Sequence, residues 1–187
     1  MMKRILVLVA AIFCVGATME ISAQTGSNKI LVAYFSHSGN TRTVAEQIHR
    51  TVGGDLLEIK TVTPYTGSYN EVLDTAQNEQ RANARPALAT RINNLASYDT
   101  IFIGYPIWWG TMPMAFFTLF EQYNFAGKTI LPFCTHEGSA LGRSVTDIKR
   151  LAPQSTVRDG LAIRGGSAGR AGNDITAWLR KNGIAER

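Results

Sequence analysis

The stretch that decides the fold of this chain is residues 29–41, Lys29-Ile-Leu-Val-Ala-Tyr-Phe-Ser-His-Ser-Gly-Asn-Thr41. Its first part is a nearly continuous apolar run, which is typical of a strand buried on both faces. The polar residues 36–41 follow, and beyond them Val44, Ala45, Ile48 and Val52 recur at helical spacing. This order predicts a strand, a polar loop and a helix, which together form the first half of a parallel βαβ unit.

The same rhythm continues to the end of the chain. Further apolar runs predict strands at residues 55–60, 100–105, 129–134 and 156–163. Helical patterns lie between and after them, at residues 69–83, from Pro113 onwards, around Ile148, and at residues 173–182. The glycine-rich residues 165–172 predict a mobile loop. Five strands alternating with helices predict one α/β domain, a five-stranded parallel sheet covered by helices on both faces.

Composition limits the classes of function. The chain has 187 residues, of which 45% are hydrophobic and 18% charged, as in a globular protein. Its formal net charge is +5, but the lysines and arginines form no run. Because nucleic-acid binding normally needs a concentrated basic patch, we do not predict it.

Residues 1–23 have the layout of a signal peptide. Lys3 and Arg4 precede the apolar residues 5–15, and small and polar residues end the segment at Ala23. The apolar run is shorter than the ~20 residues of a spanning helix, so no stable membrane span is predicted. Lipidation signals usually have a small residue directly before the cysteine, and Phe13 before Cys14 therefore disfavours lipidation. The sequence therefore predicts an exported, periplasmic protein; a true start at Met19 would instead leave it in the cytoplasm.

Cysteine and histidine are too sparse for a metal site or a disulfide. Removal of the leader takes Cys14 away and leaves Cys134 alone, which excludes an intrachain disulfide. His37, His49, Cys134 and His136 show no repeated ligand spacing, so no metal is predicted.

Three polar loops follow the first, third and fourth strands, and ligands of parallel α/β sheets bind at that edge. Residues 36–41 offer hydroxyls, one glycine and the backbone N–H groups of a helix N-terminus, which suit a phosphate. The loop matches neither a Walker A motif nor a Gly-x-Gly-x-x-Gly fingerprint. The alternative is an ordinary helix entry capped by serine or threonine.

Together with this loop, Gly104-Tyr-Pro-Ile-Trp-Trp-Gly-Thr-Met-Pro113 and Cys134-Thr-His-Glu-Gly-Ser-Ala-Leu-Gly-Arg143 resemble the flavodoxin family, in particular its branch of small FMN-binding oxidoreductases. The resemblance implies a flavodoxin-like three-layer sandwich with sheet order 2-1-3-4-5, spanning residues 29–182, and FMN as the cofactor. It also implies a phosphate loop made by Ser36, His37, Ser38, Gly39, Asn40 and Thr41.

The resemblance implies two further loops that contact the flavin ring. These are Pro106, Ile107, Trp108, Trp109 and Gly110 after the third strand, and Thr135, His136, Gly138 and Ser139 after the fourth. Trp108 is expected to stack on or edge the ring. A core position is the alternative for either tryptophan and is favoured for Trp109.

Two positions of the third loop depart from the family, which often has glycine where this chain has Glu137 and Ala140. Ala140 restricts a backbone that glycine would leave free. Glu137 is expected either near the flavin or, preferably, in solvent. A redox potential therefore cannot be carried over from the family.

The predicted function is an oxidoreductase that passes electrons from a reduced donor, such as NAD(P)H or a protein, through FMN to a quinone-like acceptor. The alternative is a flavodoxin-type electron carrier without catalysis of its own. The net positive charge favours the enzyme, because carriers of this family are commonly acidic around the flavin. A phosphatase is disfavoured, because Cys134 lacks the arginine of a Cys-x5-Arg motif and Ala140 stands in that place.

Overall fold

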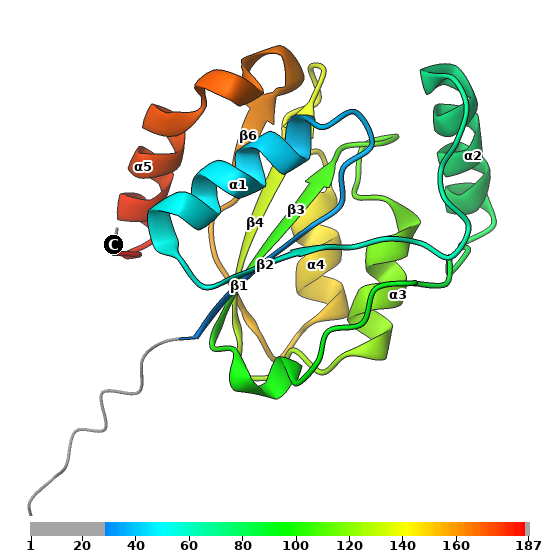
Figure 1. Cartoon of the computed structure of the whole chain (residues 1–187). Coiled ribbons are helices and arrows are strands. Elements are labelled where there is room, and N and C mark those ends of the chain that lie inside the picture. The colour runs from blue at the N-terminus through cyan, green and yellow to red at the C-terminus, as the bar shows by residue number, and fades with distance from the viewer. Residues whose placement is uncertain (1–28, 186–187) are drawn as a thin grey trace, which may run out of the picture.

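The computed structural model describes residues 29–185, and in it a parallel sheet lies between two layers of helices (Figure 1). The predicted signal peptide lies outside the described residues. Within residues 29–185, no helix is both long and apolar enough to cross a membrane.

The order of the strands matches the expected one. β1 (Ile30–Tyr34) pairs in parallel with β2 (Asp55–Glu58) on one side and with β3 (Thr100–Pro106) on the other. β4 (Thr129–His136) follows β3, and the edge is formed by β5 (Thr156–Val157) and β6 (Leu161–Arg164), which both pair with β4. The sheet order β2-β1-β3-β4-β5 confirms the prediction of a flavodoxin-like fold.

The single fifth strand predicted at residues 156–163 is wrong, because that edge is broken into β5 and β6. Thr129 pairs with Thr156, whereas Phe133 pairs with Leu161, so the edge contains one extra residue, a β-bulge. The carbonyl of Ile130 accepts a hydrogen bond from the N–H of Arg158 at 2.9 Å. Pro132, two residues further along β4, faces the same edge strand but has no N–H to donate. The regular pairing of β4 with β5 therefore ends there.

Two layers of helices cover the sheet. α1 (Asn40–Val52) and α5 (Gly172–Lys181) lie on one face, and α3 (Met114–Gln122) and α4 (Ser144–Leu151) on the other (Figure 1). Alternate residues of β1 divide between the layers: Val32 belongs to the cluster with α1 and α5, and Leu31 to the cluster with α3 and α4. This alternation follows from the two-residue period of a strand.

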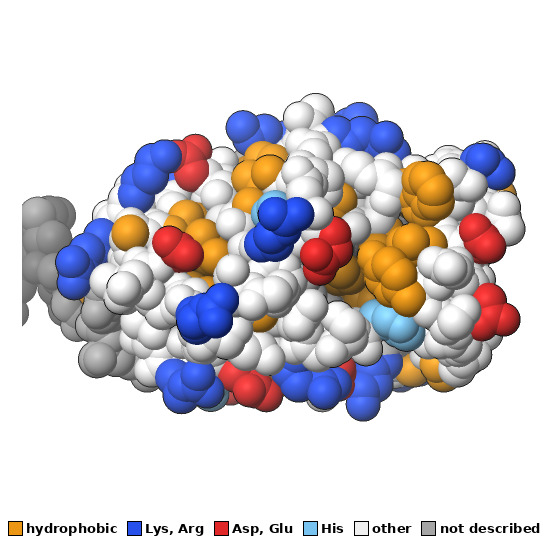
Figure 2. All heavy atoms as spheres, turned by 90° about the horizontal axis from the view of Figure 1, so that it is seen from above, with side chains coloured by type: hydrophobic (Ala, Val, Ile, Leu, Met, Phe, Trp, Pro, Cys, Tyr) orange, Lys and Arg blue, Asp and Glu red, His pale blue; other side chains and the backbone are white. Residues whose placement is uncertain are grey.

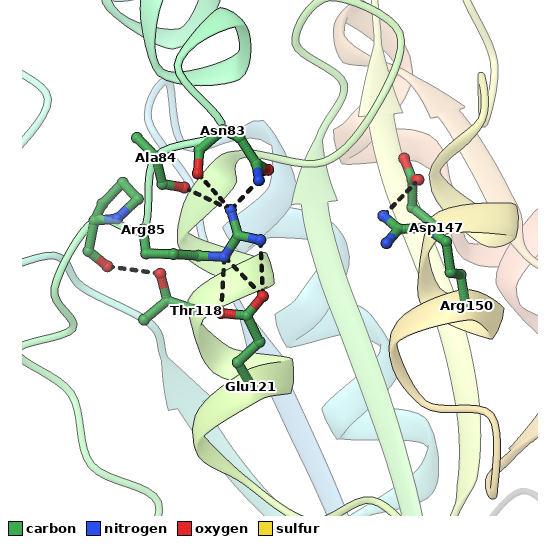
Figure 3. A network of polar contacts seen from close by, with 8 residues as sticks. Asn83, Ala84, Arg85, Thr118, Glu121, Asp147 and Arg150 are labelled. Carbon is green, nitrogen blue, oxygen red and sulfur yellow. Dashed lines mark hydrogen bonds and ion pairs between the residues drawn. The ribbon is translucent and has the colours of Figure 1, made fainter.

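α2 (Tyr69–Arg81) is the least buried helix, since only Val72 and Ala76 along it are buried. The segment that follows it is fastened to α3 by Arg85, which Figure 3 shows. The Nε of Arg85 lies 2.8 Å from both carboxylate oxygens of Glu121, and its Nη1 donates to the carbonyl of Asn83 at 2.7 Å. A short 3-10 helix, Leu95–Ser97, then leads towards β3.

The glycine-rich stretch is not the irregular loop that the sequence predicts. Gly165–Arg170 forms a 3-10 helix in which Gly165 and Ala168 are buried. The carbonyl of Ala168 accepts a hydrogen bond of 2.7 Å from Nε2 of Gln47 on α1. This contact with a neighbouring helix, which no local pattern reveals, holds the stretch in place.

Candidate functional site

The three polar loops meet at the carboxyl ends of the strands, around a pocket of about 500 Å³. Figure 2 looks onto this end of the molecule, where hydrophobic side chains gather on the right with a histidine beside them. The pocket is lined by His37, Ser38, Asn40, Tyr69, Pro106, Ile107, Trp108, Thr135, His136, Glu137, Gly138 and Ser139.

The first loop leads into α1 without closing the end of the helix. Gly39 is the N-cap with a φ of 90°, no side chain caps the helix, and its first turn holds no acidic residue. Such an uncapped N-terminus presents backbone N–H groups to an anion. Ser36 stabilises the loop, because its Oγ accepts a hydrogen bond from the N–H of Gly39 at 3.1 Å.

Thr41 lies behind this loop rather than in the pocket. It is buried, and its Oγ1 lies 2.7 Å from Oγ1 of Thr135, which links the first loop to the end of β4. The hydroxyl of Thr41 therefore has a partner within the protein.

The second loop makes a tight hairpin turn. The N–H of Trp108 donates to the carbonyl of Thr111 at 2.9 Å, and the N–H of Thr111 donates back at 3.2 Å. Trp109 and Gly110 occupy the turn with φ values of 49° and 81°, the pair of left-handed conformations that such a turn requires.

The expected order of burial of the two tryptophans is wrong. Trp108 is 2% exposed and packs edge-on against Phe35 and Tyr65, whereas Trp109 is 45% exposed. The left-handed backbone at Trp109 turns its side chain out of the core. Trp108 nevertheless lines the pocket, so it reaches the ligand space from within the aromatic cluster.

The third loop supplies a histidine in a defined tautomer. Nδ1 of His136 accepts a hydrogen bond from the N–H of Gly138 at 3.0 Å. The neutral ring therefore carries its proton on Nε2, which is a donor. Arg164 supports the same loop by donating from Nη2 to the carbonyl of Glu137 at 2.9 Å.

The departures from the family pattern in this loop have visible effects. Ala140 adopts a φ of 48°, a conformation that glycine would reach without strain. Its carbonyl accepts a hydrogen bond from Sγ of Cys134 at 3.4 Å. Burial raises the pKa of the Cys134 thiol to about 12, so this cysteine stays protonated and is no nucleophile. Glu137 is exposed and lines the pocket.

Most of the predicted site residues meet in one pocket. Those that do not line it are Ser36, Gly39, Thr41, Trp109 and Gly110, of which the first three hold the loop and the last two form the turn. Tyr69 also lines the pocket, although the sequence patterns do not predict it as a site residue. The one local feature that marks it is its position directly after Ser68, the N-cap of an exposed helix.

In the part of the chain that the structure describes, no three residues among His, Cys, Asp and Glu are placed to hold a metal ion. The donors around the pocket are hydroxyls, amides, imidazoles and backbone groups, and none of the lining residues is a lysine or arginine. The pocket thus combines neutral donors with aromatic surface, and Glu137 is the one carboxylate among its lining residues.

Comparison with known proteins gives a consistent picture. A family model described as flavodoxin matches residues 29–182. A crystal structure of a candidate flavoprotein from Bacteroides eggerthii is 36% identical, with a TM-score of 0.72, and the match covers 83% of this chain and 98% of that one. A second, from Bacteroides uniformis, is 32% identical with a TM-score of 0.73, covering 82% and 98%.

A flavoprotein from Lactobacillus acidophilus, solved in complex with FMN, is 26% identical with a TM-score of 0.65. That match covers 81% of this chain and 99% of the other. No curated protein matches at a significant level.

Proposed function

Because this chain belongs to the flavodoxin family, we propose that it binds FMN in the pocket between its three loops and acts as an oxidoreductase. In this proposal a reduced donor such as NAD(P)H gives its electrons to the bound FMN, and a quinone-like molecule takes them up. The complex of the Lactobacillus acidophilus flavoprotein with FMN supports the choice of cofactor.

The observation that carries the proposal is the open N-terminus of α1 beside an aromatic wall. α2 has a capping box made by Ser68 and Glu71, and α4 and α5 have an acidic residue in the first turn, whereas α1 and α3 have neither. Of these two open N-termini, only that of α1 contributes a residue, Asn40, to the pocket. A phosphate there would meet the N–H groups and positive end of the helix, and the nearby carboxylate of Glu137 belongs to the third loop. Ser38 and Asn40 add neutral donors at the same place.

The rest of the pocket suits the flavin ring. Pro106, Ile107 and Trp108 form an apolar wall, and Nε2 of His136 on the third loop is available to donate to a ring oxygen. When bound, FMN supplies the two-electron chemistry, which no side chain can perform. The residues of this chain hold the ring, exclude water from its apolar face and orient a hydrogen bond towards it.

An electron carrier is the second candidate, because both acidic and basic side chains surround the pocket (Figure 2). The helices run antiparallel to the strands, so the acidic residues in the first turns of α2, α4 and α5 lie towards the end of the molecule that holds the pocket. The basic residues in the last turns of α1, α4 and α5 lie at the opposite end. Arg143, Arg164 and Arg170 lie at the pocket end together with these acidic residues, so the net charge of +5 by itself is no argument against a carrier.

The experiment that separates the two is anaerobic stopped-flow mixing of the FMN-loaded protein with NADH or NADPH, followed by a soluble quinone. For the oxidoreductase we expect loss of the oxidised flavin absorbance on the order of seconds or faster with one of the nucleotides, and its return on addition of quinone. A protein that neither nucleotide reduces, although dithionite does, would contradict NAD(P)H as donor. A flavin that quinone leaves reduced would contradict the acceptor.

A further inference from the structure

Trp109 occupies a position that its side chain disfavours. It is the first residue of the two-residue turn between Trp108 and Thr111, and its φ of 49° lies in the left-handed region. Asparagine, aspartate and glycine are the residues that such turns normally carry, because a bulky side chain is strained there. A strained residue beside a ligand pocket indicates that its side chain serves a purpose at that place.

The part of Trp109 that solvent reaches is its apolar ring. Nε1 of Trp109 donates to the carbonyl of Leu73 on α2 at 2.7 Å, so the one polar atom of the indole is satisfied. The side chain is nevertheless 45% exposed. What remains open is therefore flat aromatic surface, which can stack but cannot donate a hydrogen bond.

A second exposed aromatic side chain, Tyr69, lies on α2, the helix that Trp109 contacts. Tyr69 stands about one helical turn before Leu73, whose backbone carbonyl accepts the bond from Trp109. Tyr69 is 50% exposed and lines the pocket proposed for FMN. Leu56 and Val62, the other exposed large hydrophobic residues described, belong to β2 and the loop after it and do not line this pocket.

Tyr69 lines the FMN pocket but Trp109 does not, so an occupant that contacts both side chains lies beside FMN and not in its place. It is a molecule that approaches the mouth of the pocket from outside, over the side of the face where Figure 2 shows hydrophobic side chains. The exposed ring of Trp109 carries no charge and has no free hydrogen-bond donor. Such a surface favours a planar, uncharged aromatic molecule.

We infer that Trp109 and Tyr69 form a docking platform for a planar aromatic electron acceptor of the quinone class, an inference that rests on the proposed function. On this platform the quinone lies beside the reduced cofactor. FMN in its two-electron-reduced form gives two electrons and two protons to the quinone. The products are oxidised FMN and the hydroquinone, so electrons and protons balance. Trp109 and Tyr69 position the acceptor and exchange neither.

The test compares two acceptors on the FMN-loaded protein, reduced anaerobically by light and EDTA and held at saturating FMN. One acceptor is 2-methyl-1,4-naphthoquinone, which is planar and aromatic, and the other is ferricyanide, which is neither. For Trp109→Ala we expect the rate constant for reoxidation by the quinone to fall by about 10-fold, the loss of one stacking face. Reoxidation by ferricyanide should change less than about 2-fold, since it does not stack.

Two controls separate the loss of an aromatic face from a loosened helix. Trp109→Phe keeps a ring and should restore most of the quinone rate. Gln80→Ala removes the hydrogen bond of 3.2 Å from Nε2 of Gln80 to the carbonyl of Trp108, which also ties α2 to the turn, but it removes no ring. The ratio of the quinone rate to the ferricyanide rate should stay at the wild-type value in this variant.

The outcomes distinguish this inference from the proposed function. If the wild-type protein is reoxidised by quinone but Trp109→Ala leaves the ratio of the two rates unchanged, the platform is wrong and the proposed function stands. A lowered ratio in Gln80→Ala equal to that in Trp109→Ala would likewise overturn the platform. If quinone fails to reoxidise the wild-type protein, the proposed function fails first.

Discussion

Single side chains at the centre of the molecule show how closely the sheet and the site are packed. Gly104 lies in the middle of β3, opposite Phe133 on β4, and both belong to the buried interior. A methyl group at Gly104 would fall inside the ring of Phe133. Glycine is required here for lack of space, and the requirement comes from a side chain on a different strand.

Gly104→Ala should therefore lower the free energy of unfolding by about 1–3 kcal/mol or more, the usual cost of overpacking a core. Urea unfolding measures it. Phe133→Leu in the same chain should recover part of the loss, so the two substitutions should cost less together than the sum of their separate costs. Gly166→Ala is the control, because a Cβ there meets no atom within 4 Å. Additive costs of Gly104→Ala and Phe133→Leu would show that the ring is not the obstacle.

Ser38 tests the phosphate role of the first loop. Ser38→Ala removes a hydroxyl that lines the pocket beside the N-terminus of α1. We expect FMN affinity to fall about 10-fold or more, the worth of one hydrogen bond to a charged group, and riboflavin affinity to change little because riboflavin has no phosphate. Titration of flavin fluorescence measures both. Thr51→Ala, at the far end of the same helix, should affect neither ligand. Equal losses for FMN and riboflavin would remove the phosphate from this loop.

Among the helices, α2 is held mainly by polar contacts. Ser68 Oγ caps the N–H of Glu71, and the carboxylate of Glu71 accepts from the N–H of Ser68 at 2.7 Å and from its hydroxyl at 2.8 Å. At its other end Glu79 accepts a bond of 2.7 Å from the hydroxyl of Tyr65. Burial raises the pKa of Glu79, while the bond from Tyr65 opposes this shift. Local bonds thus determine where α2 begins, and long-range bonds determine where it lies.

The capping box makes the stability of α2 depend on pH. The hydrogen bonds from Ser68 hold the pKa of Glu71 below its ordinary value of 4.5. A lowered pKa in the folded state stabilises at pH values above the unfolded pKa, and this stabilisation is lost as the pH falls through the folded pKa. Amide hydrogen exchange of residues 69–81 should therefore be faster in Glu71→Gln than in the wild type at neutral pH. The difference should shrink below pH 4.5.

Asp74→Asn is the matched control, because it removes a carboxylate from the same helix outside the capping box. It should show no such pH-dependent difference in exchange. A gap between Glu71→Gln and the wild type that persists unchanged into acid would mean that the carboxylate is not the source of the protection.

Across the entire protein, the parallel topology aligns the helices, so the charged residues of their first and last turns lie at opposite ends of the sheet. Asp147 and Asp174 stand in first turns near the pocket, and Lys149, Arg150 and Lys181 stand in last turns away from it. Each placement stabilises its own helix, since acids suit the N-terminus and bases the C-terminus. Because the helices on both faces run antiparallel to the strands, this preference has the same direction in α4 and α5. α1 and α3 have no acidic residue in the first turn, and at α1 this is where the phosphate is proposed to bind.

Local patterns in the sequence were enough to predict the order of strands and helices, because apolar runs, helical spacing and turn residues act over short distances along the chain. The resemblance to a family added the order of the sheet and the three loops at one edge, which the structure brings together as expected. Most of the site positions that the sequence predicts, from His37 to Ser139, line one pocket.

The remaining features depend on contacts between distant segments, which no local pattern contains. The backbone at Trp109 determined which tryptophan is buried, and the missing N–H of Pro132 faces the break in the edge strand. The packing of α2 brought Tyr69 to the pocket. A sequence pattern indicates which side chains prefer to be buried, but packing against other elements determines which of them are buried. At this site, that packing buries Trp108 in the wall proposed for the flavin and leaves Trp109 exposed on the proposed acceptor platform.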